Sequence, residues 1–507
     1  MQILDLFPTK HTDFNSDHRT PVRRDDRKRS SEMSGSVTNT RQASDSYHVA
    51  VIGSGPAGFY VAEALLNSEP NVCIDMFERL PVPFGLVRHG VAPDHQKLKA
   101  VTAVFEKVAM HPDFRFYGNV ELGRDIEVAE LLNTYDAVVV ATGASSDRPL
   151  GIEGENLAGS VSATEFVGWY NGHPDFRDRT FDLSHPTAVI VGNGNVALDV
   201  CRILAKSVDE LKQSDICSHA LEVLSESRIT EIVLVGRRGP VQSKFTHKEL
   251  REFGGLAVSE PTIDPDDLRL GAASELELME SASAANNLRI FRSFRSARDE
   301  RSKPRRIDFR FQLAPLRIMG AQHVEGVVFS RMELVGPAFQ QEAVMTGANV
   351  SIPAGLIVRS AGYRGVPIPG VPFDKKSATI PHVDGRVCGE DGVPVARLYV
   401  AGWIKRGPSG VIGTNRACGV DTCAAVLSDL LRREMVPACI VSARRERISS
   451  MLRARSIVPV DFEGWRKIDV LERDIGAARG KPREKLTNVP SMLAAAAPAA
   501  SRSALAR

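Results

Sequence analysis

Short apolar runs alternate with longer amphipathic segments from about residue 47 to residue 490. The runs are rich in valine and isoleucine and are bounded by glycine or polar residues, as in strands buried on both faces of a parallel sheet. The segments between them have the helical spacing of apolar positions, and this alternation is typical of an α/β fold. Strands are therefore predicted at "HVAVIG", "VCIDMFE", "YDAVVVATG", "TAVIVG", "TEIVLVG", "GLIVRSAG" and "RLYVAGW".

Three parts of the chain depart from this alternation. Between about residues 288 and 350, "LRIFRSFRSARD", "RIDFRFQLAPLRIMG" and "VEGVVFSRMEL" alternate with period two, which predicts an antiparallel meander. Residues 1–46 are polar and of mixed charge, and residues 491–507 lack a packing pattern. We expect both ends to be disordered because they cannot bury enough apolar surface.

Composition narrows the class of protein only a little. With 507 residues, 43% of them hydrophobic, the chain can form two or three domains. The net charge of +2 excludes a globally basic nucleic-acid binder, and seven scattered cysteines without Cys-x-x-Cys fit a reducing compartment. No integral membrane segment or signal peptide is predicted. We expect a cytoplasmic protein, with the mitochondrial matrix as the alternative.

The first glycine-rich turn, "GSGPAG", follows a predicted strand and opens a predicted helix. Gly53 makes the tight turn, Gly55 lets the backbone approach a pyrophosphate, and Gly58 lets helix and strand pack closely. The next strand ends in Glu78, close to the spacing at which an acid accepts hydrogen bonds from a ribose. This unit is predicted to bind a dinucleotide.

The second glycine-rich turn, "GNGNVA" at residues 192–197, is followed by a different kind of strand end. "IVLVGRRGP" places Arg237 and Arg238 where an NAD site would carry an acid. Because arginine offers planar, bidentate donors to a ribose 2′-phosphate, the turn is predicted to prefer NADP(H). The long interval between the turn and the arginines indicates an inserted helical stretch at residues 207–229. A solvated basic turn is the alternative interpretation of the arginines.

Two later stretches, "TYDAVVVATGA" at residues 134–144 and "RLYVAGWIKRGPSGVIG" at residues 397–413, resemble the remaining motifs of flavoproteins that bind two dinucleotides. The resemblance implies that the first turn binds FAD and that the FAD domain resumes after an inserted domain. NADPH on the second turn can then deliver a hydride to flavin N5, and the flavin can release electrons singly or in pairs.

The expected fold class is α/β, with two Rossmann-like three-layer dinucleotide-binding domains and the NADP domain inserted into a discontinuous FAD domain. The expected parts are a disordered extension (1–46), the first part of the FAD domain (47–145), the NADP domain (146–366), the second part of the FAD domain (367–490) and a disordered tail (491–507).

Longer stretches are more specific than either glycine turn. The chain contains, in order, "PVPFGLVRHGVAPDHQKLK", "FVGWYNGHPDF", "VGNGNVALDV", "VGRRGPVQSKFTHKELRE" and "AGWIKRGPSGVIGTN". With these it resembles the adrenodoxin reductase family, including its bacterial NADPH–ferredoxin reductases. The resemblance implies an FAD-dependent oxidoreductase that takes hydride from NADPH and passes single electrons to an acidic ferredoxin- or adrenodoxin-like iron–sulfur protein.

The turns and the resemblance together assign site residues. The FAD-binding positions are Gly53, Gly55, Ala57, Gly58, Glu78, Leu86, Val120, Trp403, Gly410, Val411 and Ile412. The NADP-binding positions are Asn193, Gly194, Asn195, Val196, Arg237, Arg238, Glu249 and Gly410. His95 and Glu249 match residues that the family keeps beside the flavin–nicotinamide pair and are the candidate catalytic residues. An interface histidine and a surface acid are the simpler interpretations of these two, and no metal site is predicted.

Basic residues supply a hypothesis about the acidic partner. Arg88, Lys405 and Arg406 are expected near the domain cleft, where their charge would attract it. Solvation or contact with flavin phosphates are the alternatives for these side chains.

Other flavoprotein classes remain open at this point. A disulfide reductase needs a redox cysteine pair, for which Cys418 and Cys423 are the candidates, although both are expected on the packed side of a helix. A monooxygenase or an amine dehydrogenase would share the glycine motifs, whereas a glutamate-synthase-like subunit would carry an N-terminal cysteine cluster that is missing before Cys73. A sensor that binds NADPH without turnover is the non-enzymatic alternative.

Overall fold

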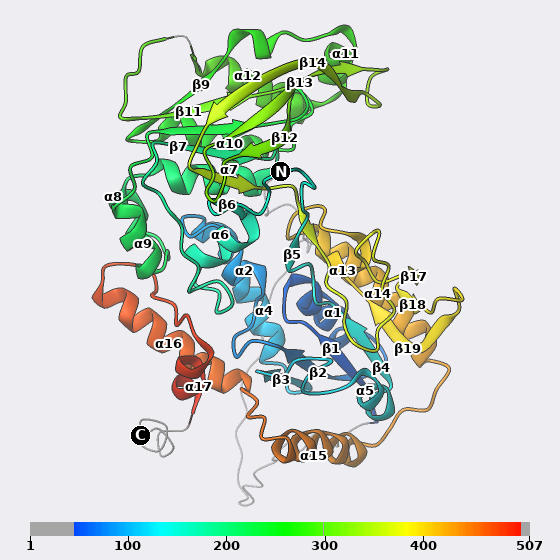
Figure 1. Ribbon diagram of the computed structural model, residues 1–507. Helices are drawn as coiled ribbons and strands as arrows, with labels where there is room; N and C mark the ends of the chain where they lie inside the picture. Colours follow the sequence, from blue (N-terminus) through cyan, green and yellow to red (C-terminus); the bar gives the residue numbers. More distant parts are fainter. Residues whose placement is uncertain (1–44, 298, 498–507) are drawn as a thin grey trace, which may run out of the picture. The chain divides into compact units, whose positions relative to one another are not determined.

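Two seven-stranded sheets organise the computed structural model, which describes residues 45–297 and 299–497 (Figure 1). The strand order is β17-β18-β19-β4-β1-β2-β3 in the first sheet and β10-β9-β11-β8-β7-β15-β6 in the second. The first sheet consists of β1 (Tyr47–Ile52), β2 (Val72–Glu78), β3 (Phe114–Gly118), β4 (Ala137–Val140), β17 (His382–Val383), β18 (Arg386–Cys388) and β19 (Pro394–Val400). The second consists of β6 (Ser160–Ser162), β7 (Thr187–Val191), β8 (Glu231–Val235), β9 (Ser259–Ile263), β10 (Arg295–Ser296), β11 (Arg305–Arg310) and β15 (Leu356–Arg359).

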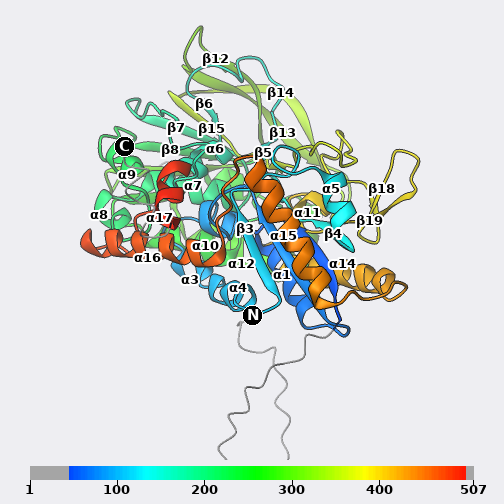
Figure 2. The same cartoon turned by 90° about the horizontal axis from the view of Figure 1, so that it is seen from below.

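We call the first sheet with the helices packed on it the first lobe, drawn from residues 45–140 and 382–497. Alternate strand residues face opposite sides, so that Val49 joins one apolar cluster and Ile52 another. One side is covered by α1, α4, α14, α16 and α17, and the other by α5 and α15, which crosses the sheet in Figure 2. The lobe's helices are α1 (Pro56–Leu66), α2 (Leu86–His89), α3 (Gln96–Lys99), α4 (Thr102–Ala109), α5 (Val128–Thr134), α13 (Trp403–Arg406), α14 (Thr414–Leu430), α15 (Ala438–Ala454), α16 (Phe462–Ala478) and α17 (Val489–Ala496).

The second lobe, residues 160–359, also has three layers, but only one outer layer is helical. Ile190 and its neighbours pack under helices, whereas Val189 and Val191 pack against a separate antiparallel sheet of order β12-β13-β14. That sheet consists of β12 (Leu313–Met319), β13 (Gly326–Val335) and β14 (Glu342–Pro353). The helices are α6 (Ala163–Tyr170), α7 (Asn195–Ala205), α8 (Val208–Leu211), α9 (Ser218–Ser225), α10 (His247–Glu252), α11 (Ala272–Glu280) and α12 (Ala282–Ser293). The prediction of two three-layer α/β units is confirmed.

The chain leaves the first sheet after β4 and returns to it at β17. On the way out it forms β5 (Ser146–Asp147), and on the way back it forms β16 (Tyr363–Arg364), which pairs antiparallel with β5. The two connecting segments therefore run side by side. We propose that the inserted domain begins and ends here, close to the boundaries expected from the sequence.

All seven predicted strands are present, as β1, β2, β4, β7, β8, β15 and β19. The meander prediction is wrong at its beginning and correct at its end. Leu288 and Phe291 lie on the buried side of α12 at helical spacing, and β11 lies inside the second sheet, parallel to β8 and β9. Within the predicted meander, the antiparallel strands are β12, β13 and β14. A short alternating run does not separate a helix from a strand, because packing decides between them.

The ends of the chain also differ from the expectation. Residues 491–496 belong to α17, whose Met492 and Ala495 are buried in the first lobe's core, so that a disordered tail from residue 491 is wrong. Ser46 is buried and pairs with Val436. The rest of the expected disordered ends, residues 1–44 and 498–507, lies outside the described residues. Within residues 45–297 and 299–497, no helix has the length and apolarity to cross a membrane.

Candidate functional site

The first glycine turn connects the carboxyl end of β1 to α1. Gly53 has φ of +101°, and a Cβ there would lie 2.6 Å from the carbonyl oxygen of Ala141. A Cβ on Gly58 would lie 2.0 Å from the carbonyl oxygen of Gly53. Both positions therefore require glycine. Pro56 begins the helix, which leaves the N–H groups of its first turn without acceptors inside the helix.

Open space lies next to this turn on the side where a dinucleotide would approach. A Cβ added to Gly55 would meet nothing within 4 Å. The Glu78 carboxylate at the end of β2 accepts hydrogen bonds from the Ser54 N–H at 3.0 Å and from its hydroxyl at 2.7 Å. The turn thus offers free N–H groups beside a fixed carboxylate, which fits a pyrophosphate and a ribose.

Segments far apart in the sequence meet at the same edge of the first sheet. Val120 follows β3 and donates its N–H to the Glu78 carbonyl at 2.9 Å. A Cβ on Gly402 would lie 2.4 Å from the Cβ of Ala57, so the loop after β19 closes directly on α1. Trp403 follows this contact and begins α13. The carboxyl ends of β1, β2, β3 and β19 therefore meet at one edge of the sheet, the position where such sheets bind ligands.

The loop at residues 410–412 is held next to Trp403. The indole N–H of Trp403 donates to the carbonyl oxygen of Ser409 at 3.1 Å. Gly410 has φ of +82°, and Val411 is 58% exposed. Leu86 begins α2 next to Gly85, where a Cβ would lie 3.0 Å from the Cα of Gly55. The structure thus brings the predicted FAD residues to one edge.

The second glycine turn repeats this arrangement at the carboxyl end of β7. A Cβ on Gly192 would lie 2.6 Å from the carbonyl oxygen of Ser360, whereas one on Gly194 would meet nothing within 4 Å. Asn195 Oδ1 accepts a hydrogen bond from the Thr246 N–H at 2.9 Å. Asn193 Oδ1 is buried without a partner. A tight turn, open space at Gly194 and an unsatisfied polar atom fit a bound dinucleotide.

Arg237 and Arg238 follow β8 and are both exposed. Neither makes an ion pair with any residue in the described part of the chain. Their guanidinium groups are therefore free to receive a phosphate beside the second turn. The inserted stretch before β8 is helical as predicted, because it forms α8 and α9.

His95 joins the two lobes, and its closest acidic partner is Glu252. His95 Nε2 lies 3.2 Å from Glu252 Oε2, and its Nδ1 lies 3.8 Å from Asp199 Oδ1. Glu249 instead accepts a hydrogen bond from the Thr246 hydroxyl at 2.8 Å. All three acids belong to helices α7 and α10 of the second lobe. The sequence placed Glu249 in this cluster and missed Glu252, which lies one helical turn further on the same face.

Arg202 is the second contact between the lobes. Its side chain is fully buried, with Nε 2.8 Å and a terminal nitrogen 3.0 Å from the two oxygens of Asp94. The same terminal nitrogen lies 2.7 Å from Asp199, and Lys206 lies 2.7 Å from Asp94. "VAPDHQ" therefore contributes Asp94 as well as His95 to the interface. The acids at residues 94 and 199 carried no sequence signal beyond their place in the quoted motifs.

These contacts set the pKa values of the cluster. Burial opposes ionisation of Asp94, but the bonds from Arg202 and Lys206 outweigh it and hold its pKa well below the usual range. Burial raises the pKa of Glu249, and the nearby Asp199 charge adds to this effect. For His95, burial favours the neutral ring, yet the Glu252 bond prevails and its pKa is raised.

We expect Glu252→Gln to lower the pKa of His95, because it removes the carboxylate that favours the protonated ring. Since the folded-state pKa lies above the ordinary value of about 6.5, this bond stabilises the fold at lower pH. The stability that the His95–Glu252 bond contributes disappears as the pH rises through the folded-state pKa of His95. An NMR titration of the His95 ring, assigned with His95→Gln, measures the change.

Glu249→Gln is the matched control for this titration, because it neutralises an acid of the same helix that is bonded to Thr246 rather than to His95. We expect Glu249→Gln to shift the pKa of His95 less than Glu252→Gln does. A larger shift than in Glu252→Gln would mean that His95 pairs with Glu249 in solution.

One of the three basic residues expected to attract the partner is not available to it. Arg88 is only 5% exposed and lies 2.5 Å from the buried Glu472, so that its charge is not available to an approaching partner. Lys405 donates to the Thr422 hydroxyl at 3.1 Å, and Arg406 donates to Asn415 Oδ1 at 3.0 Å. Both are half-buried, so a docking role for them stays a hypothesis.

The candidate redox cysteines lie on the packed side of α14. Cys418 and Cys423 are both free and buried. Burial raises the pKa of the Cys423 thiol to about 11, which disfavours the reactive thiolate. Cys418 Sγ accepts a hydrogen bond from the Gly402 N–H at 3.2 Å. Their surroundings fit a core role better than disulfide chemistry.

The fold and the two turns define a protein that binds two dinucleotides, and known proteins give the family. Residues 47–252 match the family model described as pyridine nucleotide-disulphide oxidoreductase. NADPH-ferredoxin reductase FprA of Mycobacterium leprae is 45% identical over 453 residues, which cover 88% of this chain and 98% of that protein. The mitochondrial NADPH:adrenodoxin oxidoreductase of Arabidopsis thaliana is 41% identical over 464 residues, covering 89% and 95%.

A solved structure gives the same result. Mycobacterium tuberculosis FprA in complex with NADPH matches with a TM-score of 0.83 and 44% identity, over 89% of this chain and 99% of that chain. The chain therefore belongs to the family of NADPH–ferredoxin and NADPH–adrenodoxin reductases, and the resemblance seen in the sequence is confirmed.

Proposed function

We propose that this protein is an FAD-dependent oxidoreductase that takes hydride from NADPH and passes single electrons to a ferredoxin-like iron–sulfur protein. One observation carries the proposal: two lobes each present a glycine turn, and buried contacts such as Arg202 to Asp94 join the lobes. The proposal is supported by the relatives named as NADPH–ferredoxin and NADPH:adrenodoxin reductases. The established likeness extends over nearly the whole length of those proteins.

The first lobe is proposed to hold FAD. The N–H groups at the start of α1 bind its pyrophosphate, and the Glu78 carboxylate accepts from a ribose hydroxyl. Trp403 and the loop at residues 410–412, joined through Ser409, close over the flavin. FAD bound here supplies hydride acceptance from NADPH and release of the two electrons one at a time. The remaining proposed contacts are Gly53, Gly55, Ala57, Gly58, Leu86 and Val120.

The second lobe is proposed to hold NADPH. The start of α7 binds the pyrophosphate, and Arg237 and Arg238 bind the 2′-phosphate. The orphaned Asn193 Oδ1 accepts a hydrogen bond from the nucleotide. The other proposed contacts are Gly194, Asn195, Val196, Glu249 and Gly410.

His95 and Glu249 are proposed to act at the junction of the two nucleotides. The His95 ring, held at 3.2 Å by Glu252, can keep a proton near neutral pH and orient a polar group beside the flavin edge. The raised pKa of Glu249 allows its carboxyl to donate a hydrogen bond when protonated. Hydride transfer needs no side-chain nucleophile, so both groups position the reactants and manage protons.

The location of the protein is a separate proposal. We propose that it works in the cytoplasm, on the basis of its 45% identity to a bacterial reductase. The relatives from Arabidopsis thaliana and Salvelinus fontinalis are named as mitochondrial, which makes the mitochondrial matrix the alternative. Fractionation of the source cells, with the reductase detected by antibody, decides between the two.

An anaerobic titration of the purified holoprotein tests the function. We expect one equivalent of NADPH to bleach the visible flavin band, whereas NADH bleaches it only at large excess. Adding an oxidised ferredoxin should then restore the band as the iron–sulfur protein is reduced. A yellow protein that NADPH cannot bleach would favour a nucleotide sensor. Bleaching without electron transfer to any of several ferredoxins, despite rapid transfer to ferricyanide, would overturn only the proposed partner.

A further inference from the structure

A cavity of about 210 Å³ lies where α3, α4 and α16 meet the segment before α9. It brings together three parts of the chain that are distant in sequence, including Lys99 of α3, Asp215 of the second lobe and Trp465 of α16. Phe84 lines the cavity with its side chain, while its N–H donates to the Ser54 carbonyl in the first turn at 3.0 Å. The cavity therefore adjoins the first glycine turn, and none of the predicted FAD- or NADP-binding residues lines it.

Basic side chains outnumber acids around this cavity. Glu106, Asp215 and Asp469 line it, and the buried Glu472 lies behind them. With all four acids ionised and Lys99 protonated, the five basic residues leave the group with a net charge of +1. The basic residues are Arg88, Lys99, Arg473, Arg483 and Lys485.

The two lysines share one carboxylate. Lys99 Nζ lies 2.6 Å and 2.8 Å from the two oxygens of Asp215, and Lys485 Nζ lies 3.5 Å from one of them. The ammonium of Lys485 is almost fully buried and finds only neutral oxygens besides, on Asn171 and in the Asp215 backbone. Burial, together with the neighbouring charge of Lys485, lowers the pKa of Lys99 to about 7. The single Asp215 carboxylate therefore does not balance the charge of both lysines when both are protonated.

Arg88 and Arg483 both contact the Glu472 carboxylate, and Arg483 also forms an ion pair with Asp469 at 2.7 Å. Glu472 lies 2.5 Å and 2.9 Å from the terminal nitrogens of Arg88, and 2.9 Å from Arg483. Nε of Arg88 is buried without a hydrogen-bond partner. An additional acceptor in the cavity would supply the partner that Nε of Arg88 lacks.

We propose that this cavity binds a small tetrahedral oxyanion, of the class of sulfate and inorganic phosphate, at a site separate from both dinucleotide sites. A water molecule occupies about 30 Å³ in the liquid, so the cavity has room for one such anion with a few waters. Lysine and arginine are the side chains that bind tetrahedral oxyanions. The anion would tie the second lobe and α16 to the first lobe, which goes beyond the proposed function.

Isothermal titration calorimetry of the FAD-containing protein with sodium sulfate tests the proposal. Saturating NADP⁺ keeps the anion from the 2′-phosphate site, and sodium chloride holds the ionic strength constant. We expect one sulfate per chain with a dissociation constant of about 1 mM or lower, and competition by inorganic phosphate. Absence of saturable binding up to tens of millimolar, on the order of ten times that constant, overturns the proposal.

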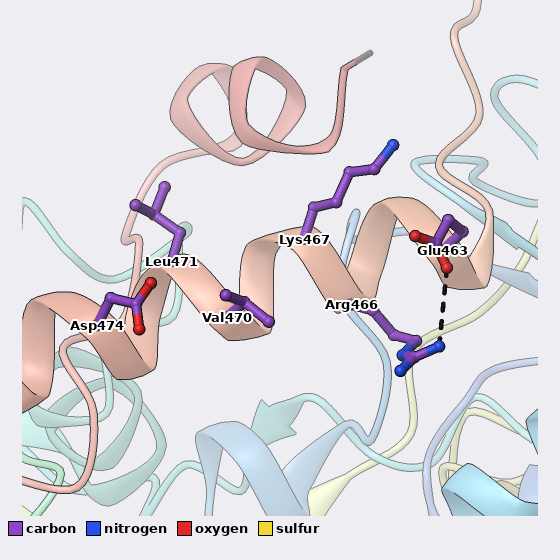
Figure 3. A pocket seen from close by; sticks show the side chains of 6 residues that line it. All are labelled: Glu463, Arg466, Lys467, Val470, Leu471 and Asp474. Carbon is purple, nitrogen blue, oxygen red and sulfur yellow. Dashed lines mark ion pairs between the residues drawn. The ribbon is translucent and has the colours of Figure 1, made fainter. Parts of the chain in front are cut away.

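Two lysine-to-methionine variants, one inside the cavity and one outside it, locate the anion. Lys485→Met should weaken sulfate binding by about tenfold or more, because it removes a desolvated charge. The control is Lys467→Met, on the outer face of α16, where Figure 3 shows its side chain directed away from the helix among Glu463, Val470 and Leu471. We expect the control to bind within about twofold of the unaltered protein. Equal weakening by both variants would mean that only net charge matters, and would overturn the proposed site.

Arg473→Gln is a second test of the site for the case that Lys485→Met destabilises the fold. The Arg473 side chain is 57% exposed at the edge of the cavity, so its replacement should disturb the core little. Flavin content and circular dichroism show whether each variant is folded. We expect a weakening of several-fold, on the order of that for one partly exposed ion pair. Unchanged binding in both folded variants would contradict the assignment.

The pH dependence gives an independent measurement. Asp215, Lys485, Cys217 and His89 are the charged or titratable groups that interact with Lys99. Sulfate stays a dianion from pH 6 to pH 8.5, whereas Lys99 loses its proton as the pH rises through this range. We therefore expect tighter binding at pH 6 than at pH 8.5, and a smaller difference in Lys99→Met. A flat profile in the unaltered protein would overturn the position of the anion beside Lys99.

Discussion

The double variant Arg237→Ala/Arg238→Ala is expected to lose about 10²–10³-fold in kcat/KM for NADPH, while kcat/KM for NADH changes little. Both guanidinium groups are exposed beside the second turn, and neither forms an ion pair in the described part of the chain. Each charge-assisted hydrogen bond to a phosphate contributes about 1.5–3 kcal/mol, and NADH lacks that phosphate. Steady-state reduction of ferricyanide with each nucleotide measures both constants.

The control for this experiment is Arg228→Ala. Arg228 is also exposed, but it lies three residues before β8, at the opposite end of the same strand. We expect its kcat/KM values to stay within about twofold of the unaltered protein. An equal loss of kcat/KM with NADPH and with NADH in the double variant would mean that the arginines do not recognise the 2′-phosphate.

Arg202→Met is expected to lower the free energy of unfolding by about 3–5 kcal/mol, because it leaves the buried Asp199 without its nearest cation and Asp94 with Lys206 alone. Asp94 and Asp199 both lie within 3.0 Å of the Arg202 guanidinium. The same variant should slow flavin reduction by NADPH by about 10²-fold, because the relative position of the lobes is lost. Urea denaturation and anaerobic stopped-flow reduction measure the two effects.

The pH dependence of stability identifies the cause. The folded-state pKa of Asp94 lies below its ordinary value, so its ion pair stabilises the fold above that value, and this stability is lost as the pH falls through the folded pKa. Arg202→Met should lose less stability on acidification than the unaltered protein. Lys206→Met is the control, because Asp94 keeps its bond to Arg202 there, and a smaller destabilisation is expected. Equal destabilisation by the two variants would refute a central role for Arg202.

The parts of the fold that could be predicted are those specified by local patterns. The all-buried strand Tyr47–Ile52 and the glycine turn after it were recognisable because one continuous stretch carries strand, turn and helix signals. The run around Leu288 was misassigned because its alternation extends over too few residues to separate a strand from a helix. The small-residue sequence of α17 has no packing pattern of its own, which favours disorder. Its Met492 is buried only because folding brings it against the first lobe's core.

The candidate site divides in the same way. The arginines after β8 could be found from the sequence because a charge at a strand end has a fixed relation to the turn before it. The partner of His95 could not, because Glu249 and Glu252 belong to one short helix and a motif does not state which acid faces the other lobe. Arg88 was misread for a related reason, since its acceptor Glu472 is 384 residues away.

Local order along this chain therefore specified two dinucleotide turns, because each turn lies within one strand–turn–helix unit. The flavin cofactor and the family followed from resemblance of longer stretches distributed along the chain. Only the tertiary structure decides which charged side chains stay unpaired. It also decides which of them form ion pairs between the lobes. Burial makes an unpaired charge costly, so Arg202, Lys99 and Arg88 each depend on an acid that folding brings from another part of the chain. No periodicity encodes those distances, because they are set by how the two sheets and α16 pack together.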